Sequence, residues 1–162
     1  MNQTFESFRR KIISPLNFFL YTMKSLPAAY FCGVRIKSLQ QDAAVVSIQQ
    51  KWFNKNPFRS IYFAALSMAA EMSTGLLVMG HIIDKQPLLS VIVTNISGGF
   101  IKKATGKILF TCSNGMQIRE CANTAFASGE AISIVCHTTG VNEQNEIVAQ
   151  FEITWSFKLR KK

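Results

Sequence analysis

Apolar residues recur at steps of three and four along the first 25 residues: Phe5, Phe8, Ile12, Leu16, Phe19 and Met23. This spacing places side chains on one face of an α-helix. Pro15 would break a helix interior, but Ser14 before it is a favoured N-cap and proline is favoured at the first helical position. Residues 1–26 are therefore predicted to form two short helices that stop before Pro27.

From Val34 onward the pattern changes to an alternation of apolar and polar residues, which is typical of half-buried strands. The runs 34–37 and 44–49 predict a hairpin that turns at residues 40–42. The runs 88–96, 106–112, 131–139 and 147–158 predict four more strands, the last two joined by the polar turn 142–146. Between them, helical spacing of Ile118, Cys121, Ala122 and Ala125 predicts a helix over 117–127.

The run 61–83, with Ser60 as its N-cap, is apolar on nearly every face. A helix without a polar stripe must be surrounded by protein or by lipid. At about 34 Å it is long enough to cross a bilayer. Glu71 lies near its middle, however, where an acidic residue costs roughly 2.5–3.5 kcal/mol to insert into a membrane. We therefore expect the core helix of an α+β domain with an antiparallel sheet.

Length, composition and the N-terminal pattern indicate the domain organisation and the cellular compartment. A chain of 162 residues, 48% of them hydrophobic, fits a single domain. We assign 1–26 to an N-terminal helical segment and 27–162 to the main domain. The apolar stretch after the first basic residues is interrupted by Ser14, Pro15 and Asn17, unlike a signal peptide, so we expect a cytoplasmic protein.

The charge and the cysteines narrow the chemistry. Eighteen Lys and Arg against nine Asp and Glu give a net charge of +9, which favours phosphates, acidic carrier proteins or anionic lipid as partners. The cations are scattered and no nucleic-acid-binding motif is present, so no nucleic acid is expected. The four cysteines form no paired motif and there is no histidine cluster. We expect reduced thiols, no metal and no cofactor.

Segment 56–71 (NPFRSIYFAALSMAAE) resembles the hotdog-fold thioesterases of the phenylacetate-pathway type. That family has an Asn, a spacer, a His-Gly-Gly-Ala-Leu stretch that opens the helix, and an Asp or Glu about two turns later. Ala65 and Leu66 match the Ala-Leu pair, and Glu71 matches the acid. Segment 100–106 is similar to the family's Tyr-Leu-Arg-Pro-Ala strand. The resemblance covers roughly residues 30–158. The Tyr-Phe-x-x-Leu stretch at 62–66 and the Thr-Trp-Ser-Phe-Lys stretch at 154–158 are most similar to an uncharacterised, thioesterase-like branch of the hotdog proteins.

The resemblance implies a hotdog fold, in which a curled antiparallel sheet wraps around one long helix, here preceded by N-terminal helices. It also implies a homodimer or a dimer of dimers that acts on acyl thioesters of coenzyme A or acyl carrier protein. Tyr62 and Phe63 replace the family's His and Gly, and Lys103 replaces its Pro. These changes bear on the activity rather than on the fold, because a fold does not dictate chemistry.

Glu71 is the candidate catalytic residue, as general base or nucleophile, with the helix amides around Ile61 to Phe63 polarising the thioester carbonyl. A plain structural role, such as facing a dimer seam, is the alternative. The candidate substrate-binding residues are Asn56, Arg59, Tyr62, Phe63, Thr74, Lys102 and Lys103. Each of these residues also has a plain structural alternative. Asn56 can serve in a turn, the rings of Tyr62 and Phe63 can pack in the core, and the Thr74 hydroxyl can bond back to its own helix. The cations can simply be solvated surface residues.

Two alternatives remain open from the sequence. One is a non-catalytic protein that holds an acyl group or acyl thioester, which the rings of Tyr62 and Phe63 make credible. The other is a weak contact with anionic membrane through the basic, Phe-rich N-terminus, where Phe5, Phe8, Phe18 and Phe19 accompany Arg9, Arg10 and Lys11. A lid over the sheet or dimer is the alternative use of these helices.

Overall fold

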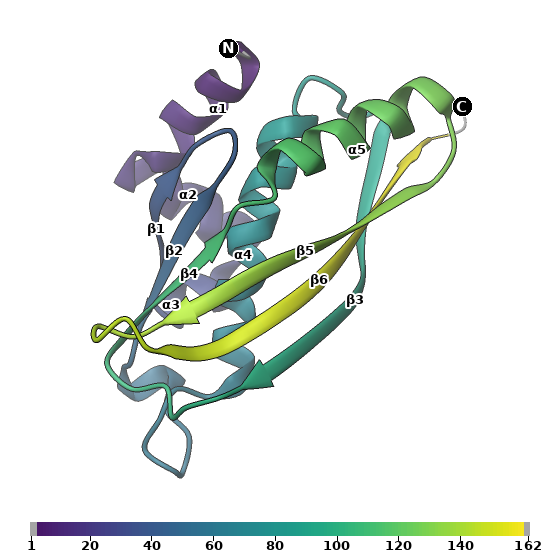
Figure 1. Cartoon of the computed structure of the whole chain (residues 1–162). Coiled ribbons are helices and arrows are strands. Elements are labelled where there is room, and N and C mark those ends of the chain that lie inside the picture. Colours follow the sequence, from purple (N-terminus) through teal and green to yellow (C-terminus); the bar gives the residue numbers. More distant parts are fainter. Residues whose placement is uncertain (1–2, 161–162) are drawn as a thin grey trace.

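The computed structural model describes residues 3–160 and places helix α4 (Phe63–Ile82) across the inner face of a curled sheet (Figure 1). α4 is long and apolar enough to span a membrane, but most of it is buried inside this domain. The prediction of a core helix is therefore confirmed. Its start is corrected: the N-cap is Tyr62 rather than Ser60, and no side chain caps the helix.

The sheet has six strands within the described residues, each antiparallel to its neighbours, in the order β1-β2-β4-β5-β6-β3. The strands are β1 (Val34–Leu39), β2 (Ala44–Gln49), β3 (Leu89–Phe100), β4 (Lys107–Cys112), β5 (Ile132–Val141) and β6 (Ile147–Leu159). β3 follows α4 in the chain and pairs only with β6, so it forms one edge of the sheet (Figure 1). All six predicted strands are present; β2 has the predicted bounds, and the other five have shifted ends.

β3 extends four residues beyond the predicted end at Ile96, through a Gly-Gly pair that resembles a turn signal in the sequence. The structure gives Gly98 a packing role. A Cβ at Gly98 would lie 2.6 Å from the ring of Phe151 on β6, so only glycine leaves room for that ring. A register shift between Val93 and Asn95 marks a bulge in the same strand.

The N-terminal segment forms α1 (Gln3–Ile13) and α2 (Pro15–Ser25), and a third helix that was not predicted, α3 (Pro27–Phe31), follows it at the start of the main domain. The expected apolar face holds in α1, where Phe5, Phe8 and Ile12 are buried. Phe5 stacks on His81 at the end of α4, and a Cβ on Gly80 would collide with its ring.

In α2 the expected apolar face is wrong. Leu16 is 66% exposed, whereas Phe18 and Thr22 are buried. The reason is that Pro15 starts a new helix, so the three-four spacing does not continue in phase from α1. Ser14 stands at the N-cap, but its side chain makes no capping hydrogen bond.

The remaining elements are the 3₁₀ helix η1 (Trp52–Asn54) and helix α5 (Gly115–Ser128), which spans the predicted helix over 117–127. α5 connects β4 to β5 and packs against α4, β5 and β6. The inner faces of the sheet, α4, α5 and the N-terminal helices share one hydrophobic core. The four cysteines are free thiols and buried, as expected.

Candidate functional site

Glu71 lies midway along α4 with a half-buried side chain. Among residues 3–160, its carboxylate has no hydrogen-bond or ion-pair partner. Burial raises the pKa of this carboxyl above its ordinary value of 4.5. The phenol of Tyr21 on α2 also has a raised pKa, mainly because of burial and secondarily because of the Glu71 charge. A partly desolvated acid that nothing neutralises is typical of a functional residue.

An apolar cavity of about 320 Å³ opens on one side of Glu71. It lies between α2, α4 and β3, and Tyr21 donates a hydrogen bond of 3.0 Å to the Met79 sulfur at its wall. Its apolar lining comprises Leu26, Met72, Leu76, Val78, Met79, Ile82, Val91 and Trp155. A pocket with this lining and a single acid at its mouth fits an apolar chain that ends in a polar group.

A groove of about 510 Å³ opens on the other side of Glu71. Ala64, Ser67, Met68 and Glu71 line it from α4, at the spacing of one helical face. Ile96 and Phe100 line it from β3; they are 47% and 52% exposed. Their register partners on β6, Ile153 and Ala149, are fully buried, so the apolar inner face of the sheet continues onto β3 without a cover.

A third hollow, of about 600 Å³, lies at the N-terminal end of α4 and shares Phe63 and Phe100 with the groove. Asn56, Phe58, Ser60, Lys102 and Lys103 are among its other lining residues. The three spaces therefore follow one another along α4, with Glu71 between the first and the second. From Phe63 to Glu71 the path along the helix is about 12 Å.

The loop before α4 is organised by Asn56. Its amide oxygen accepts hydrogen bonds from the backbone N–H groups of Phe58 (3.0 Å) and Ser60 (3.1 Å), and its amide nitrogen donates to the Ser60 hydroxyl (3.0 Å). Arg59 between them has a positive φ of 63° and an exposed side chain. Asn56 thus has the turn role that the sequence left open, while it also lines the third hollow.

Two of the three amides expected to face a substrate already have partners. The N–H of Ile61 donates to the Ala104 carbonyl (2.8 Å), and that of Tyr62 donates to the Asn54 carbonyl (2.7 Å). Within residues 3–160 no acceptor receives the N–H groups of Phe63 and Ala64, which open α4. The free amides at this helix N-terminus are therefore that of Phe63, which was predicted, and that of Ala64, which was not; both residues line the groove.

Thr74 does not fit the predicted substrate contact, because it is fully buried and lines none of these spaces. Its hydroxyl donates to the backbone carbonyl of Glu71 (2.9 Å) and accepts from the Trp155 indole N–H (2.9 Å). Thr74 therefore anchors β6 to α4 directly beneath Glu71. It is an instance of the bond back to its own helix that the sequence left open.

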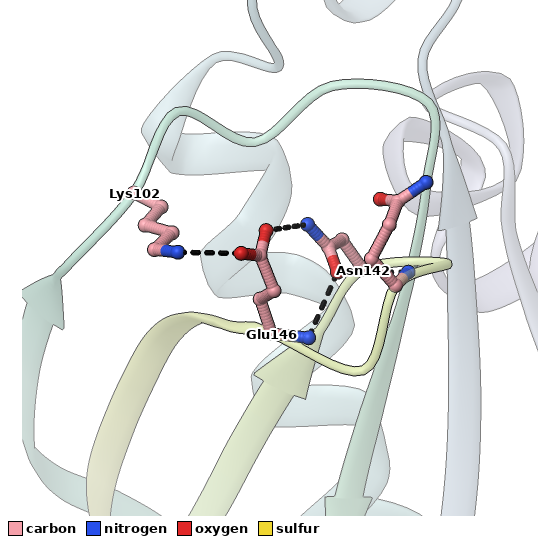
Figure 2. A network of polar contacts seen from close by, with 4 residues as sticks. Lys102, Asn142 and Glu146 are labelled. Carbon is pink, nitrogen blue, oxygen red and sulfur yellow. Dashed lines mark hydrogen bonds and ion pairs between the residues drawn. The ribbon is translucent and has the colours of Figure 1, made fainter.

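Two cations among the predicted substrate-binding residues, Lys102 and Lys103, line the third hollow. Lys102 forms an ion pair of 2.7 Å with Glu146, whose other carboxylate oxygen accepts from the Asn142 side chain (2.9 Å; Figure 2). This network lowers the pKa of Glu146, chiefly through the hydrogen bond from Lys102. Both partners of the pair are about half exposed, and exposed ion pairs of this kind contribute little to stability. Lys103 has no partner among the described residues.

Tyr62 and Phe63 stack edge to face, with ring centroids 4.7 Å apart, and Phe63 also contacts Phe100 on β3. Both rings are about half exposed and line the third hollow. They occupy the entrance between the loop and the groove. Across residues 3–160, no group of three or more His, Cys, Asp or Glu side chains is positioned to hold a metal ion.

Comparison with solved structures identifies the fold. The chain is similar to PA5026 from Pseudomonas aeruginosa, a protein of unknown function described as a probable thioesterase, with 20% identity, a TM-score of 0.76, and coverage of 90% of this chain and 97% of that one. It is also similar to thioesterase HI1161 from Haemophilus influenzae (14%, TM-score 0.60, coverage 86% and 88%). The PaaI protein of the E. coli phenylacetic acid degradation operon is similar as well (14%, TM-score 0.60, coverage 88% and 91%).

This chain is thus an α+β protein with the hotdog fold of the thioesterase-like proteins, as the sequence predicted. No curated protein sequence matches it. The family model described as "Domain of unknown function (DUF4442)" matches residues 18–157, and the chain belongs to that family.

Proposed function

We propose that this protein hydrolyses acyl thioesters, with Glu71 as general base or nucleophile. The observation that carries the proposal is the unpartnered, desolvated carboxyl of Glu71 at the junction of an apolar cavity and a groove that leads to free helix amides. In this scheme the acyl chain enters the cavity, and the thioester carbonyl lies in the groove.

As a general base, Glu71 takes a proton from water while the water oxygen bonds to the carbonyl carbon. As a nucleophile, its carboxylate attacks that carbon directly and water later hydrolyses the acyl-enzyme anhydride. In both routes the carbon–sulfur bond breaks, the thiol leaves with a proton, and the fatty acid is released. A general base works best when its pKa lies near the working pH, because it is then deprotonated and still binds a proton strongly. The raised pKa of Glu71 is a shift in this direction.

We propose that the active form is a homodimer or a dimer of dimers. The Ala64 amide and Glu71 are seven residues apart on one helix, about 10 Å. A carbonyl held by that amide is therefore beyond the reach of the same chain's carboxylate, which must act within about 3 Å or through one water. Pairing of two β3 edges would cover Ile96 and Phe100 and bring Glu71 of one protomer towards the helix N-terminus of the partner subunit.

The carrier of the acyl group in this proposal is coenzyme A or an acyl carrier protein. Lys102 and Lys103 line the third hollow, and Arg59 lies in the loop between Phe58 and Ser60, which line it as well. We assign the phosphates of the carrier to these cations. Because the Lys102–Glu146 pair is exposed and weak, a phosphate can take its place. The chemistry needs no cofactor, and cytoplasmic location stays a prediction.

A second candidate function is the binding of an acyl group or thioester without cleavage. The observation that favours it is the pair of rings of Tyr62 and Phe63 at the entrance to the groove, where the resembling thioesterases have His and Gly. These rings narrow the approach of a carbonyl to the amides of Phe63 and Ala64.

Steady-state hydrolysis of an acyl-CoA series from acetyl to palmitoyl, followed by release of free thiol, separates the two functions. Turnover that improves with chain length supports hydrolysis, because the cavity behind Glu71 is apolar. Saturable binding of the same compounds without thiol release supports the binding protein.

A further inference from the structure

The N-terminal helices and η1 present a continuous apolar surface to solvent. Phe19 on α2 contacts Tyr30 on α3, Tyr30 contacts Phe31, and Phe31 contacts Phe53 on η1, with ring centroids 5.2, 6.1 and 6.0 Å apart. Leu16 and Leu20 extend this row along the Phe19 face of α2, and Trp52 precedes Phe53 in η1. We call this set the aromatic face; its members are Leu16, Phe19, Leu20, Tyr30, Phe31, Trp52 and Phe53.

The exposure of the aromatic face is unusually high for such side chains. Trp52 is 79% exposed, Leu16 is 66% exposed and Phe31 is 52% exposed. Single exposed apolar side chains are ordinary on protein surfaces. A contiguous group of them marks a site of interaction with a protein, a membrane or a ligand. Phe5, Phe8 and Phe18, which the sequence placed on a membrane-facing side, are instead buried, so the surface differs from the predicted one.

The charge around the aromatic face is positive. The two segments that carry this face, 14–35 and 51–55, contain four cations, Lys24, Arg35, Lys51 and Lys55, and no Asp or Glu. The Arg35 guanidinium lies 4.1 Å from the centre of the Tyr30 ring. The Lys51 side chain passes Gly33, 3.4 Å from where a Cβ would lie, and Lys24 and Lys55 are exposed on α2 and directly after η1.

We propose that the aromatic face docks the protein on the surface of an anionic lipid bilayer. Aromatic and leucine side chains rimmed by Lys and Arg match both the interfacial region and the negative headgroups of such a membrane. A protein partner would need acids around an apolar centre of matching shape. An anionic bilayer needs no such match, and it suits the segments 14–35 and 51–55, which contain cations and no acid. The contact is peripheral, because α4 is enclosed by the domain.

Docking in this orientation would place the cavity beside Glu71 next to the bilayer. Leu16, Phe19 and Leu20 face outward from α2, while Tyr21 and the following Ser25 and Leu26 line the cavity. One helix thus separates the membrane from the proposed acyl site, which suits a ligand whose chain partitions into lipid. The docking itself does not depend on Glu71, so it can be tested apart from hydrolysis.

Trp52 provides the probe, because the only other tryptophan, Trp155, is buried. The full chain is mixed with phosphatidylcholine vesicles with or without phosphatidylglycerol. We expect sedimentation with the anionic vesicles, a blue shift of tryptophan emission that Trp52→Phe abolishes, and weaker binding in high salt. Trp52→Ser with Phe31→Ser should weaken binding by at least about tenfold, and Lys51→Gln and Lys24→Gln by about fivefold each.

The matched controls are Met116→Ser, an exposed apolar residue on α5, and Lys158→Gln, an exposed cation on β6; both should bind as the wild type does. The proposal is overturned by no binding to anionic vesicles, or by equal binding of the wild type and the Trp52/Phe31 variant. It is also overturned if this variant halves the particle mass in solution, since the face would then be covered by a second copy of the chain.

Discussion

A Cβ on Gly75 would lie 3.1 Å from Oε1 of Glu71, one turn back on the same helix. Gly75 therefore leaves space for the carboxylate in the middle of a helix, where glycine normally costs about 1 kcal/mol relative to alanine. The same Cβ would lie 3.6 Å from the Trp155 ring on β6, so the carboxylate cannot be displaced freely towards β6.

Gly75→Ala should lower kcat by about tenfold, because the carboxylate must move by a few tenths of an ångström away from its place between the cavity and the groove. The thermal midpoint should stay the same or rise, since alanine is the better helix former. The measurement pairs thiol-release kinetics with a melting curve. Gly99→Ala is the control, because a Cβ there meets nothing within 4 Å. Unchanged kcat in a folded Gly75→Ala protein would contradict this role for Glu71.

The pH dependence of stability follows from the raised pKa of Glu71. The unfolded chain loses this proton near pH 4.5, whereas the folded chain loses it at higher pH because the group is buried. Within that window folding takes up a proton, so the contribution of Glu71 to stability is largest below pH 4.5 and falls as pH rises.

Glu71→Gln removes this effect, so its melting midpoint at pH 7 should exceed that of the wild type, and the difference should shrink as the pH falls towards 4.5. Melting curves across this range provide the measurement. Glu152→Gln is the control, because that carboxylate is exposed. A variant that is less stable than the wild type at pH 7 would mean that an unseen partner stabilises the charged form.

The proposed dimer is tested at the β3 edge. Ile92 and Ile96 are 63% and 47% exposed, and their register partners Ser156 and Ile153 lie on opposite faces of β6. Ile92→Lys with Ile96→Lys places like charges on both faces of the edge, which opposes pairing of two copies. Light scattering should give twice 18.1 kDa, or four times, for the wild type and 18.1 kDa for the variant.

Hydrolysis should fall together with the mass, because each proposed site combines two chains. Ile147→Lys, an exposed apolar residue on β6, is the control and should remain oligomeric. A wild-type protein that is monomeric and hydrolyses thioesters would exclude the two-chain site.

The fold was predictable because its main elements have unambiguous patterns. α4 is apolar all round and must be enclosed, and β6 alternates from Ala149 onward because one face packs on the core while the other meets solvent. What could not be predicted depends on tertiary contacts. The phase of α2 depends on how the chain restarts at Pro15, and β3 passes through Gly98 because a ring from β6 needs that space.

The candidate site, too, could be predicted only in part from the sequence. Glu71 could be found because an acid within an apolar helix stands out in the sequence. The roles of its neighbours depended on hydrogen-bond competition that a sequence does not reveal: Thr74 bonds Trp155, Ile61 bonds Ala104, and Asn56 bonds its own loop. Gly75 could have been noticed as a glycine one turn after Glu71, but its function depends on where the carboxylate points.

The most direct test of the central claim is the kcat/KM for acyl-CoA hydrolysis by wild type, Glu71→Gln and Glu71→Ala, with Glu152→Gln as control, each verified as folded and of wild-type mass. The account predicts turnover by wild type and the control, and a loss of roughly 10²–10⁴-fold in both Glu71 variants. Wild-type turnover by Glu71→Gln would show that this carboxylate does not carry the reaction.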